Sequence, residues 1–187
     1  LSEVEMKTIV NKWRAKNKNI VGLWAGVEEA VIRALKTRKK IVLSQYRGLV
    51  FEHDGKALTI QLPSGRKLFY QNAELGINKF GKSSVKYKGI DLLTKKWWWV
   101  DSYGGKFVEN IVQAIARDLL ANSMQDIYRL GYKIVMHVHD EVVCEVSEGL
   151  SEHSLKEICR IMGVVPEWAE GLPLTADGYL TKYYKKD

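Results

Sequence analysis

The stretch Tyr132-Lys-Ile-Val-Met-His-Val-His139-Asp140-Glu141-Val-Val-Cys-Glu-Val146 places three polar residues between two apolar, largely β-branched arms. Arms of this composition predict two strands, and the polar centre predicts the tight turn of a β-hairpin. The ladder of a hairpin holds the residues at its tip, so adjacent carboxylates there form a stiff mount for a divalent cation. The stretch therefore indicates a candidate metal site.

Two other interpretations of this hairpin stay open at the level of sequence. Asp and Glu are common at turns simply because turns are solvated, so the acids can be turn residues and nothing more. A zinc site built from His137, His139 and Asp140 is the second alternative. The two histidines share one strand face while Asp140 begins the turn, and no further His or Cys pair stands nearby.

Composition and charge narrow the class of protein. Of the 187 residues 46% are hydrophobic, so we expect a folded core and not a disordered chain. Lys and Arg number 29 against 22 Asp and Glu, which gives a net charge of +7. This charge favours an anionic partner, nucleic acid before an acidic membrane surface, although a basic protein without such a partner is also possible. No apolar run reaches the length of about 18 residues that a membrane span needs.

Three further features concern the cellular context. Cys144 and Cys159 are too few for a disulfide framework, which favours a reducing compartment. No signal peptide is visible. The chain opens with Leu1 instead of Met, so we expect it to be a piece of a longer protein.

Helical periodicity marks both ends of the chain. Helices are predicted over about 2–17, with Ser2 and Glu5 as a capping box, and over about 20–38. The second ends in a basic cluster that is either a solvated helix end or a phosphate-tracking patch: Arg33, Lys36, Arg38, Lys39 and Lys40. Further helices are predicted over about 106–130, ending at Gly131, and over 151–162, with a closing strand over 174–180.

Between these helices the hydrophobic period changes to two. Strands over 49–53 and 57–62 flank Asp54-Gly55, a pair that favours a tight hairpin turn, and further strands are predicted over 66–70 and 84–90. The run Lys95-Lys96-Trp97-Trp98-Trp99 is either a base-stacking platform or a strand that buries two of its rings, and strand alternation favours burial. The fold class is therefore α+β, with helices packed on an antiparallel sheet and a small antiparallel β-meander as an insertion.

Several of these segments together resemble a known family. They are the long helix followed by Val138-His-Asp-Glu-Val142, the segment Tyr103-Gly-Gly-Lys-Phe-Val-Glu-Asn-Ile-Val-Gln-Ala-Ile-Ala-Arg-Asp118, and Leu62-Pro-Ser-Gly-Arg66. In this order they resemble the C-terminal palm of family A, DNA polymerase I-like, DNA polymerases of the bacteriophage type. The resemblance extends over most of the chain and is strongest over 101–146.

The resemblance implies roles for individual residues. Asp140 would be the catalytic, metal-binding carboxylate, Glu141 a supporting acid, and His139 the residue that approaches the primer-terminal nucleotide. On the preceding helix, Gln113 would contact the minor groove of the duplex. Asn110 and Lys106 would also bind DNA, but bacterial relatives carry the asparagine one step earlier, where this chain has Glu109.

The resemblance also implies cofactors and partners. Two Mg²⁺ ions, primer–template DNA and deoxynucleoside triphosphates belong to the complete enzyme, in the cytoplasm of a bacterial or phage-infected cell. The chain would divide into a helical segment at 1–44 that follows the fingers helix, the meander at 45–100, and the palm part at 101–187. A first metal-binding Asp and a fingers helix are not found in this sequence. We therefore expect the chain to be inactive alone, to pair with the missing N-terminal part of the polymerase, and to be prone to self-association.

Two alternatives from other classes remain. A non-catalytic nucleic-acid-binding module is suggested by the positive charge and by the Trp97–Trp99 run. A metal-dependent nuclease or phosphatase would use His137, His139 and Asp140.

Overall fold

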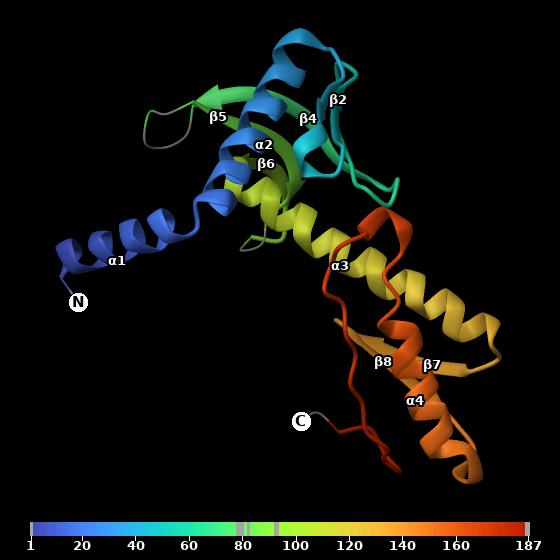
Figure 1. Ribbon diagram of the computed structural model, residues 1–187. Helices are drawn as coiled ribbons and strands as arrows, with labels where there is room; N and C mark the ends of the chain where they lie inside the picture. The colour runs from blue at the N-terminus through green and yellow to red at the C-terminus, as the bar shows by residue number, and fades with distance from the viewer. Residues whose placement is uncertain (1, 78–80, 82, 92–93, 186–187) are drawn as a thin grey trace. The chain divides into compact units, whose positions relative to one another are not determined.

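A computed structural model describes residues 2–77, 81, 83–91 and 94–185, and it has the predicted α+β character. The chain divides into two compact units, Leu1–Val112 and Gln113–Asp187, which are described separately (Figure 1). Residues 78–80, 82, 92 and 93 of the predicted meander lie outside the described residues. The three-part division into 1–44, 45–100 and 101–187 stays a prediction.

The first unit opens with helices α1 (Glu3–Lys16) and α2 (Lys18–Thr37), close to the predicted ranges. The capping box is present, because the Ser2 hydroxyl accepts from the Glu5 amide while the Glu5 carboxylate accepts from the Ser2 amide. No residue of α1 is buried, although its apolar residues follow helical spacing. In contrast, α2 buries one stripe, composed of Val27, Ala30, Val31 and Ala34.

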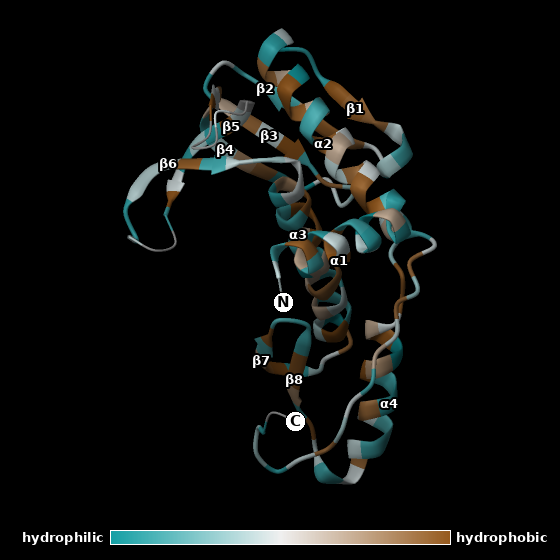
Figure 2. Cartoon of the chain, turned by 90° about the vertical axis from the view of Figure 1, so that its left-hand side faces the viewer, coloured by the Kyte–Doolittle hydropathy of each residue, from teal (hydrophilic) through white to brown (hydrophobic). Residues whose placement is uncertain are grey.

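An antiparallel sheet follows, and its described strands are neighbours in chain order. They are β1 (Ile41–Leu43), β2 (Leu49–His53), β3 (Ala57–Gln61), β4 (Lys67–Ile77), β5 (Ser83–Ile90) and β6 (Trp97–Ser102), with a 3₁₀ turn at Ser44–Tyr46. The predicted meander is confirmed in topology, while β1 extends it at one edge and the tryptophan run extends it at the other. Helix α2 packs on β1 to β4, and apolar residues recur along these elements (Figure 2).

The tight turn predicted at Asp54-Gly55 connects β2 and β3. Gly55 adopts a φ of 98°, which a residue without a Cβ atom tolerates. The Asp54 carboxylate accepts from the backbone amides of Lys56 and Ala57, each at 2.7 Å. These two bonds also hold the pKa of Asp54 below its usual value.

A β-bulge interrupts β4, a feature that the alternation of the sequence did not predict. Gln71 pairs with Lys88 and Glu74 pairs with Lys86, so β4 has one more residue than β5 between these pairs. Asn72 lies at the bulge with a φ of 52°, a left-handed conformation that Asn adopts more readily than most residues.

Helix α3 (Gly104–Arg129) begins on the core of the first unit. Phe107 is fully buried, and its ring meets the ring of Tyr70 edge-on at a centroid distance of 5.0 Å. Tyr70 meets Tyr87 in the same manner at 4.9 Å. Buried aromatic side chains contribute on the order of 2 kcal/mol each through area alone, and edge-on pairs add to this. The cluster therefore anchors the start of α3 on β4 and β5.

The second unit contains the rest of α3, the hairpin β7 (Lys133–Val138) and β8 (Glu141–Glu145), and α4 (Ser151–Met162). Short 3₁₀ turns occur at Glu148–Leu150 and Glu167–Ala169. Gly131 follows α3 with a φ of 87°, as expected for a C-cap glycine. Helix α4 begins at the predicted residue.

The predicted closing strand over 174–180 is wrong, because these described residues form no strand. The chain instead passes along α4, where a Cβ atom on Gly178 would lie 2.9 Å from Leu155 and 3.3 Å from the Cys159 sulfur. The close approach of Gly178 to α4 is a contact between distant parts of the sequence, which local pattern does not predict.

The expectation that strand β6 buries two tryptophans is also wrong. Trp97 and Trp98 are 57% and 67% exposed, and only Trp99 is partly covered. Within the described sheet β6 is an edge strand. The residue opposite Trp98 is Gly89, which has no side chain to cover it, and the residue opposite Trp97 is the exposed Ile90.

Within the described part of the chain, none of the helices combines the length and the apolar character that crossing a membrane requires.

The start of α3 provides a test of the packing. A Cβ atom on Gly104 would lie 2.1 Å from the Trp24 carbonyl oxygen and 2.8 Å from Glu28 Cβ. We expect Gly104→Ala to lower the free energy of unfolding by at least about 2 kcal/mol, because backbone must move to admit the methyl group. Thermal or urea unfolding measures this. The matched control is Gly149→Ala, where nothing lies within 4 Å, and equal stability of the two variants would contradict the close approach.

Candidate functional site

The predicted carboxylate hairpin is present. Val138 pairs with Glu141, so His139 and Asp140 alone form the turn between β7 and β8. His139 adopts a left-handed φ of 51°, as the favoured two-residue hairpin turns require. Glu141 therefore opens β8 and is not part of the turn.

The two carboxylates at the tip have different surroundings. Asp140 is exposed and makes no hydrogen bond or ion pair with any described residue. Glu141 accepts a hydrogen bond of 3.1 Å from the Tyr184 hydroxyl. Desolvation and this bond raise the pKa of Tyr184, so the phenol stays protonated and continues to donate. The tip thus presents one free carboxylate and one that is oriented by the C-terminal segment.

The base of the hairpin is tied down by polar contacts. Lys133 of β7 forms an ion pair with Glu145 of β8, and hydrogen bonding to Lys133 lowers the pKa of Glu145. Tyr132 donates to Glu157 of α4, and this bond raises the pKa of Tyr132. The ribbon is therefore fixed at its base both across the ladder and to the neighbouring helix.

The alternative of a zinc site is wrong within the described residues, which contain no group of three or more His, Cys, Asp and Glu side chains able to hold a metal ion. His139 lies in the turn and His137 in β7, so the two rings do not share a strand face as the spacing suggested. Asp140 and Glu141 supply oxygen donors, which is the ligand type that Mg²⁺ prefers. Two carboxylates fit a part of such a site and not the whole of it.

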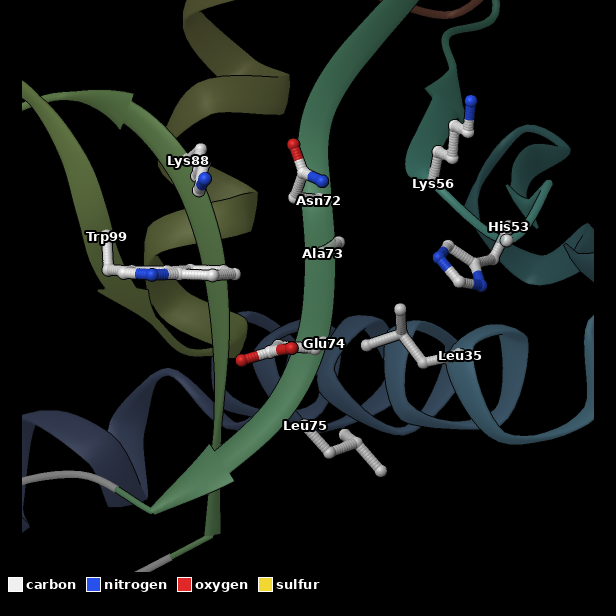
Figure 3. A pocket seen from close by; sticks show the side chains of 10 residues that line it. Leu35, His53, Lys56, Asn72, Ala73, Glu74, Leu75, Lys88 and Trp99 are labelled. Atoms are coloured by element: carbon white, nitrogen blue, oxygen red, sulfur yellow. The ribbon is translucent and has the colours of Figure 1, made fainter.

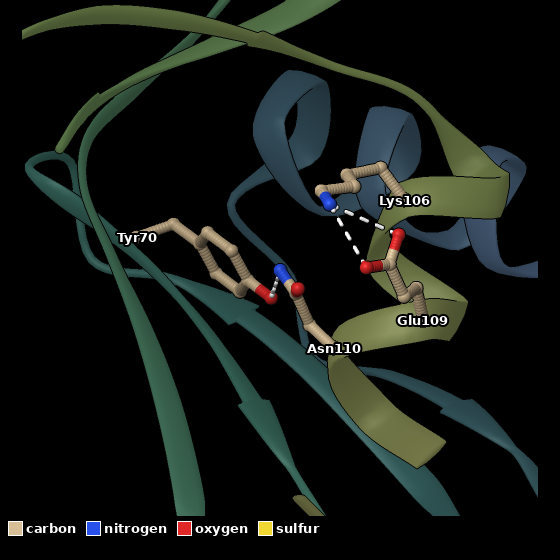
Figure 4. Close-up of polar contacts among 4 residues, drawn as sticks. All are labelled: Tyr70, Lys106, Glu109 and Asn110. Carbon is tan, nitrogen blue, oxygen red and sulfur yellow. Dashed lines mark hydrogen bonds and ion pairs between the residues drawn. The ribbon is translucent and has the colours of Figure 1, made fainter. Parts of the chain in front are cut away.

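The predicted DNA-contacting residues lie on α3 in different surroundings. Gln113 is exposed in the second unit. In the first unit, the Asn110 amide donates to the Tyr70 hydroxyl at 3.0 Å, and the Lys106 ammonium contacts both oxygens of Glu109, at 3.0 and 2.9 Å (Figure 4). Asn110 thus has a structural partner, and the DNA-binding roles of Gln113, Asn110 and Lys106 stay predictions.

Part of the basic cluster at the end of α2 is used locally. Arg33 lies 3.9 Å from Glu29, and Lys40 lies 3.9 Å from Glu52. These ion pairs are exposed and contribute little. Arg38 ends α2 with a left-handed φ of 54°.

The sequence alone carries no signal for the hydrogen bond from Tyr184 to Glu141, because the two residues lie 43 positions apart.

The fold and the hairpin define a basic α+β protein with a solvent-facing carboxylate at a stiff tip. Over its whole length the chain is 48% identical to a protein named DNA polymerase from Bacillus phage SP02, and it spans 28% of that relative. The chain is therefore similar to one part of a phage DNA polymerase. Neither a family model nor a solved structure matches it.

The Tyr70–Asn110 pair provides a test by pH. Burial raises the pKa of Tyr70 to about 12, and the Asn110 hydrogen bond opposes this only in part. Because the folded state holds this proton more tightly, the stability is complete below the unfolded pKa near 10 and is lost as the pH rises toward 12. We expect a loss on the order of 2 kcal/mol across this window, measured by urea unfolding.

The control for this test is Tyr70→Phe, which removes the titrating group while keeping the ring. Tyr87 is half-buried with a raised pKa and contributes a remaining slope in both proteins. An equally steep alkaline loss in the Phe variant would assign the effect to other groups.

Proposed function

We propose that this chain is the C-terminal palm portion of a phage-type, family A DNA polymerase. The complete enzyme would transfer nucleotides from deoxynucleoside triphosphates to the 3′-hydroxyl of a primer paired with a template. The observation that carries the proposal is the similarity to the phage polymerase along the whole chain, together with the free Asp140 carboxylate at the hairpin tip. The net charge of +7 suits a polyanionic partner.

In this proposal Asp140 holds Mg²⁺ and Glu141 assists it. Bound Mg²⁺ would lower the pKa of the primer hydroxyl and neutralise the triphosphate charge. An exposed carboxylate without a partner among the described residues suits this task, because no hydrogen bond or ion pair to them must break when a cation binds. Tyr184 donates to one oxygen of Glu141 and leaves the other oxygen available.

The remaining roles follow from position. His139 precedes Asp140 in the turn, so a nucleotide brought to the metal-binding carboxylate also meets this imidazole. Gln113 is exposed on α3 in the same compact unit. Its amide would contact acceptors in the minor groove that all correct base pairs share, which tests pair geometry without selecting sequence.

We expect the 187-residue chain alone to show no primer extension with Mg²⁺. A two-metal site needs carboxylates from more than one segment, and the described residues contain no suitable group of three. A gel assay with a labelled primer–template measures this, and robust extension by the chain alone would contradict the proposal of a partial site.

A chimera tests the assignment of Asp140 directly. In it, this chain replaces the matched segment of the phage SP02 polymerase. We expect Asp140→Ala to lower the turnover of the active chimera by on the order of a thousandfold, because a metal ion contributes several kcal/mol to the transition state. Affinity for primer–template DNA, measured by anisotropy, should change little.

Two variants accompany this test. Glu141→Gln should reduce turnover less than Asp140→Ala. Glu152→Ala removes an exposed carboxylate from α4 and should leave turnover unchanged. Near-normal turnover of the Asp140→Ala chimera would remove this residue from the metal site.

A second candidate function is a non-catalytic nucleic-acid-binding module. The exposure of Trp97 and Trp98, beside Lys95 and Lys96, favours it, because exposed rings next to cations stack on bases. It predicts an Asp140→Ala chimera with full turnover. A metal-dependent phosphoesterase built on His137, His139 and Asp140 is disfavoured by the lack of a three-residue metal cluster in the described chain.

A further inference from the structure

A cavity of about 500 Å³ lies in the first unit, at the end of the β2–β3 hairpin and beside the bulge of β4 (Figure 3). Strand β3 pairs with β4 only as far as Ala57 and Gln71. From Asn72 onward, β4 therefore has a described strand only on its β5 side. Cavities of this volume are in the range that holds a nucleotide-sized ligand, and bulges are frequent beside binding sites.

One end of the cavity contains His53, whose ring nitrogens have no hydrogen-bond partner in the part of the chain that the structure describes. Both ring nitrogens of His53 are buried, and neither has a partner among the described residues. Leaving such groups unsatisfied costs stability, and native structures rarely do so without a reason. In Figure 3 the ring extends from β2 toward β4, into the space that the cavity occupies. A turn of the ring that brings a nitrogen to the cavity would allow a polar ligand to supply a missing partner.

Positive charge accompanies His53 at this end. Lys56 lines the cavity immediately after the turn. The guanidinium carbon of Arg38 lies 3.8 Å from the position that a Cβ atom on Gly55 would take, so the Arg38 charge stands beside the same turn. Two cations and an imidazole favour an anion, and a phosphate group has the acceptor oxygens that all three can use.

The opposite end of the cavity is aromatic. Trp99 and Lys88 are paired across β6 and β5, so their side chains share one face, and the Lys88 ammonium lies 5.4 Å from the ring centroid. The ammonium lies over the ring, so a planar base that stacks on this partly exposed indole would take its place, and the displaced ammonium can bind base oxygens. Glu74 lies between the two ends and offers an acceptor for an N–H group of a base, such as the N3–H of thymine.

We propose that this cavity binds one nucleotide, with its phosphate at His53, Lys56 and Arg38 and its base against Trp99. A nucleotide has the same division into an anionic end and a flat aromatic end. The inference that the ligand is a deoxynucleotide rests on the proposed function. The inference that the cavity binds a nucleotide rests only on the residues that line it. The nucleotide can be a free one or one residue of a single-stranded segment of DNA, since both present the same groups.

Binding to the folded 187-residue chain tests this inference, with folding checked by circular dichroism. The probes are thymidine monophosphate, a short oligothymidylate, the same oligonucleotide without bases, and inorganic phosphate. We expect saturable binding of a base-carrying probe that Trp99→Leu and Lys56→Gln each weaken by about tenfold, the scale of one stacked base. Binding of the monophosphate identifies a free nucleotide, and binding of the oligonucleotide alone identifies a strand.

Matched controls separate the cavity from the rest of the surface. Trp98→Leu changes an exposed ring on the opposite face of β6, and Lys12→Gln removes an exposed cation from α1. Neither should affect binding. An equal loss with Trp98→Leu, equal binding of the oligonucleotide without bases, or no binding of any probe would overturn the proposal.

His53→Phe distinguishes a binding role from a structural one. It removes two buried, unsatisfied nitrogens and keeps a ring, so the free chain should unfold at an equal or higher temperature while nucleotide binding weakens. Loss of both stability and binding would assign His53 to the core. Asp140→Ala should leave nucleotide binding by the cavity unchanged. If the cavity binds no nucleotide while the Asp140→Ala chimera loses turnover, the inference of a nucleotide site is wrong and the proposed polymerase function still holds.

Discussion

The close approach of α3 to α2 is the constraint on which the first unit depends. Gly104 brings the backbone of α3 against the Trp24 carbonyl, at a distance that no residue with a Cβ atom permits. One turn later Phe107 reaches Tyr70, and the Tyr70 ring reaches Tyr87 on the next strand. Because buried rings leave little free space, this start of α3 fixes the middle of the sheet. Strand β6 then pairs with β5, which the Tyr87 contact holds in place.

Local chemistry made several parts of the fold predictable from sequence. The capping box at Ser2, the Asp54-Gly55 turn and the C-cap at Gly131 depend on backbone conformations and hydrogen bonds within a few residues. The hairpin at Asp140 belongs to the same group, because turn and arms are adjacent in the chain. Where the signal and its structural partner were neighbours, the prediction succeeded.

Other features depend on partners that lie far away in the sequence. Alternation at Trp97–Trp99 correctly indicated a strand, but burial depends on what covers it, and β6 lies at the edge of the described sheet. The segment 174–180 forms no strand, and Gly178 lies against Leu155 and Cys159 of α4, which local sequence does not reveal. The bulge at Asn72 and the buried ring nitrogens of His53 follow from how three strands end relative to one another, which periodicity does not encode.

The two candidate sites use opposite strategies for polar groups. At the hairpin tip the Asp140 carboxylate stays in water, so its charge costs nothing in desolvation, and the ladder behind it supplies stiffness. At the cavity, the two ring nitrogens of His53 make no hydrogen bond with the described residues, so this cost in free energy is present before any ligand binds. A solvated acid suits a strongly hydrated cation that keeps some of its waters, whereas dehydrated nitrogens suit a ligand that brings its own polar atoms. The same chain can therefore carry both sites without competition between them, because each selects its ligand by a different physical property.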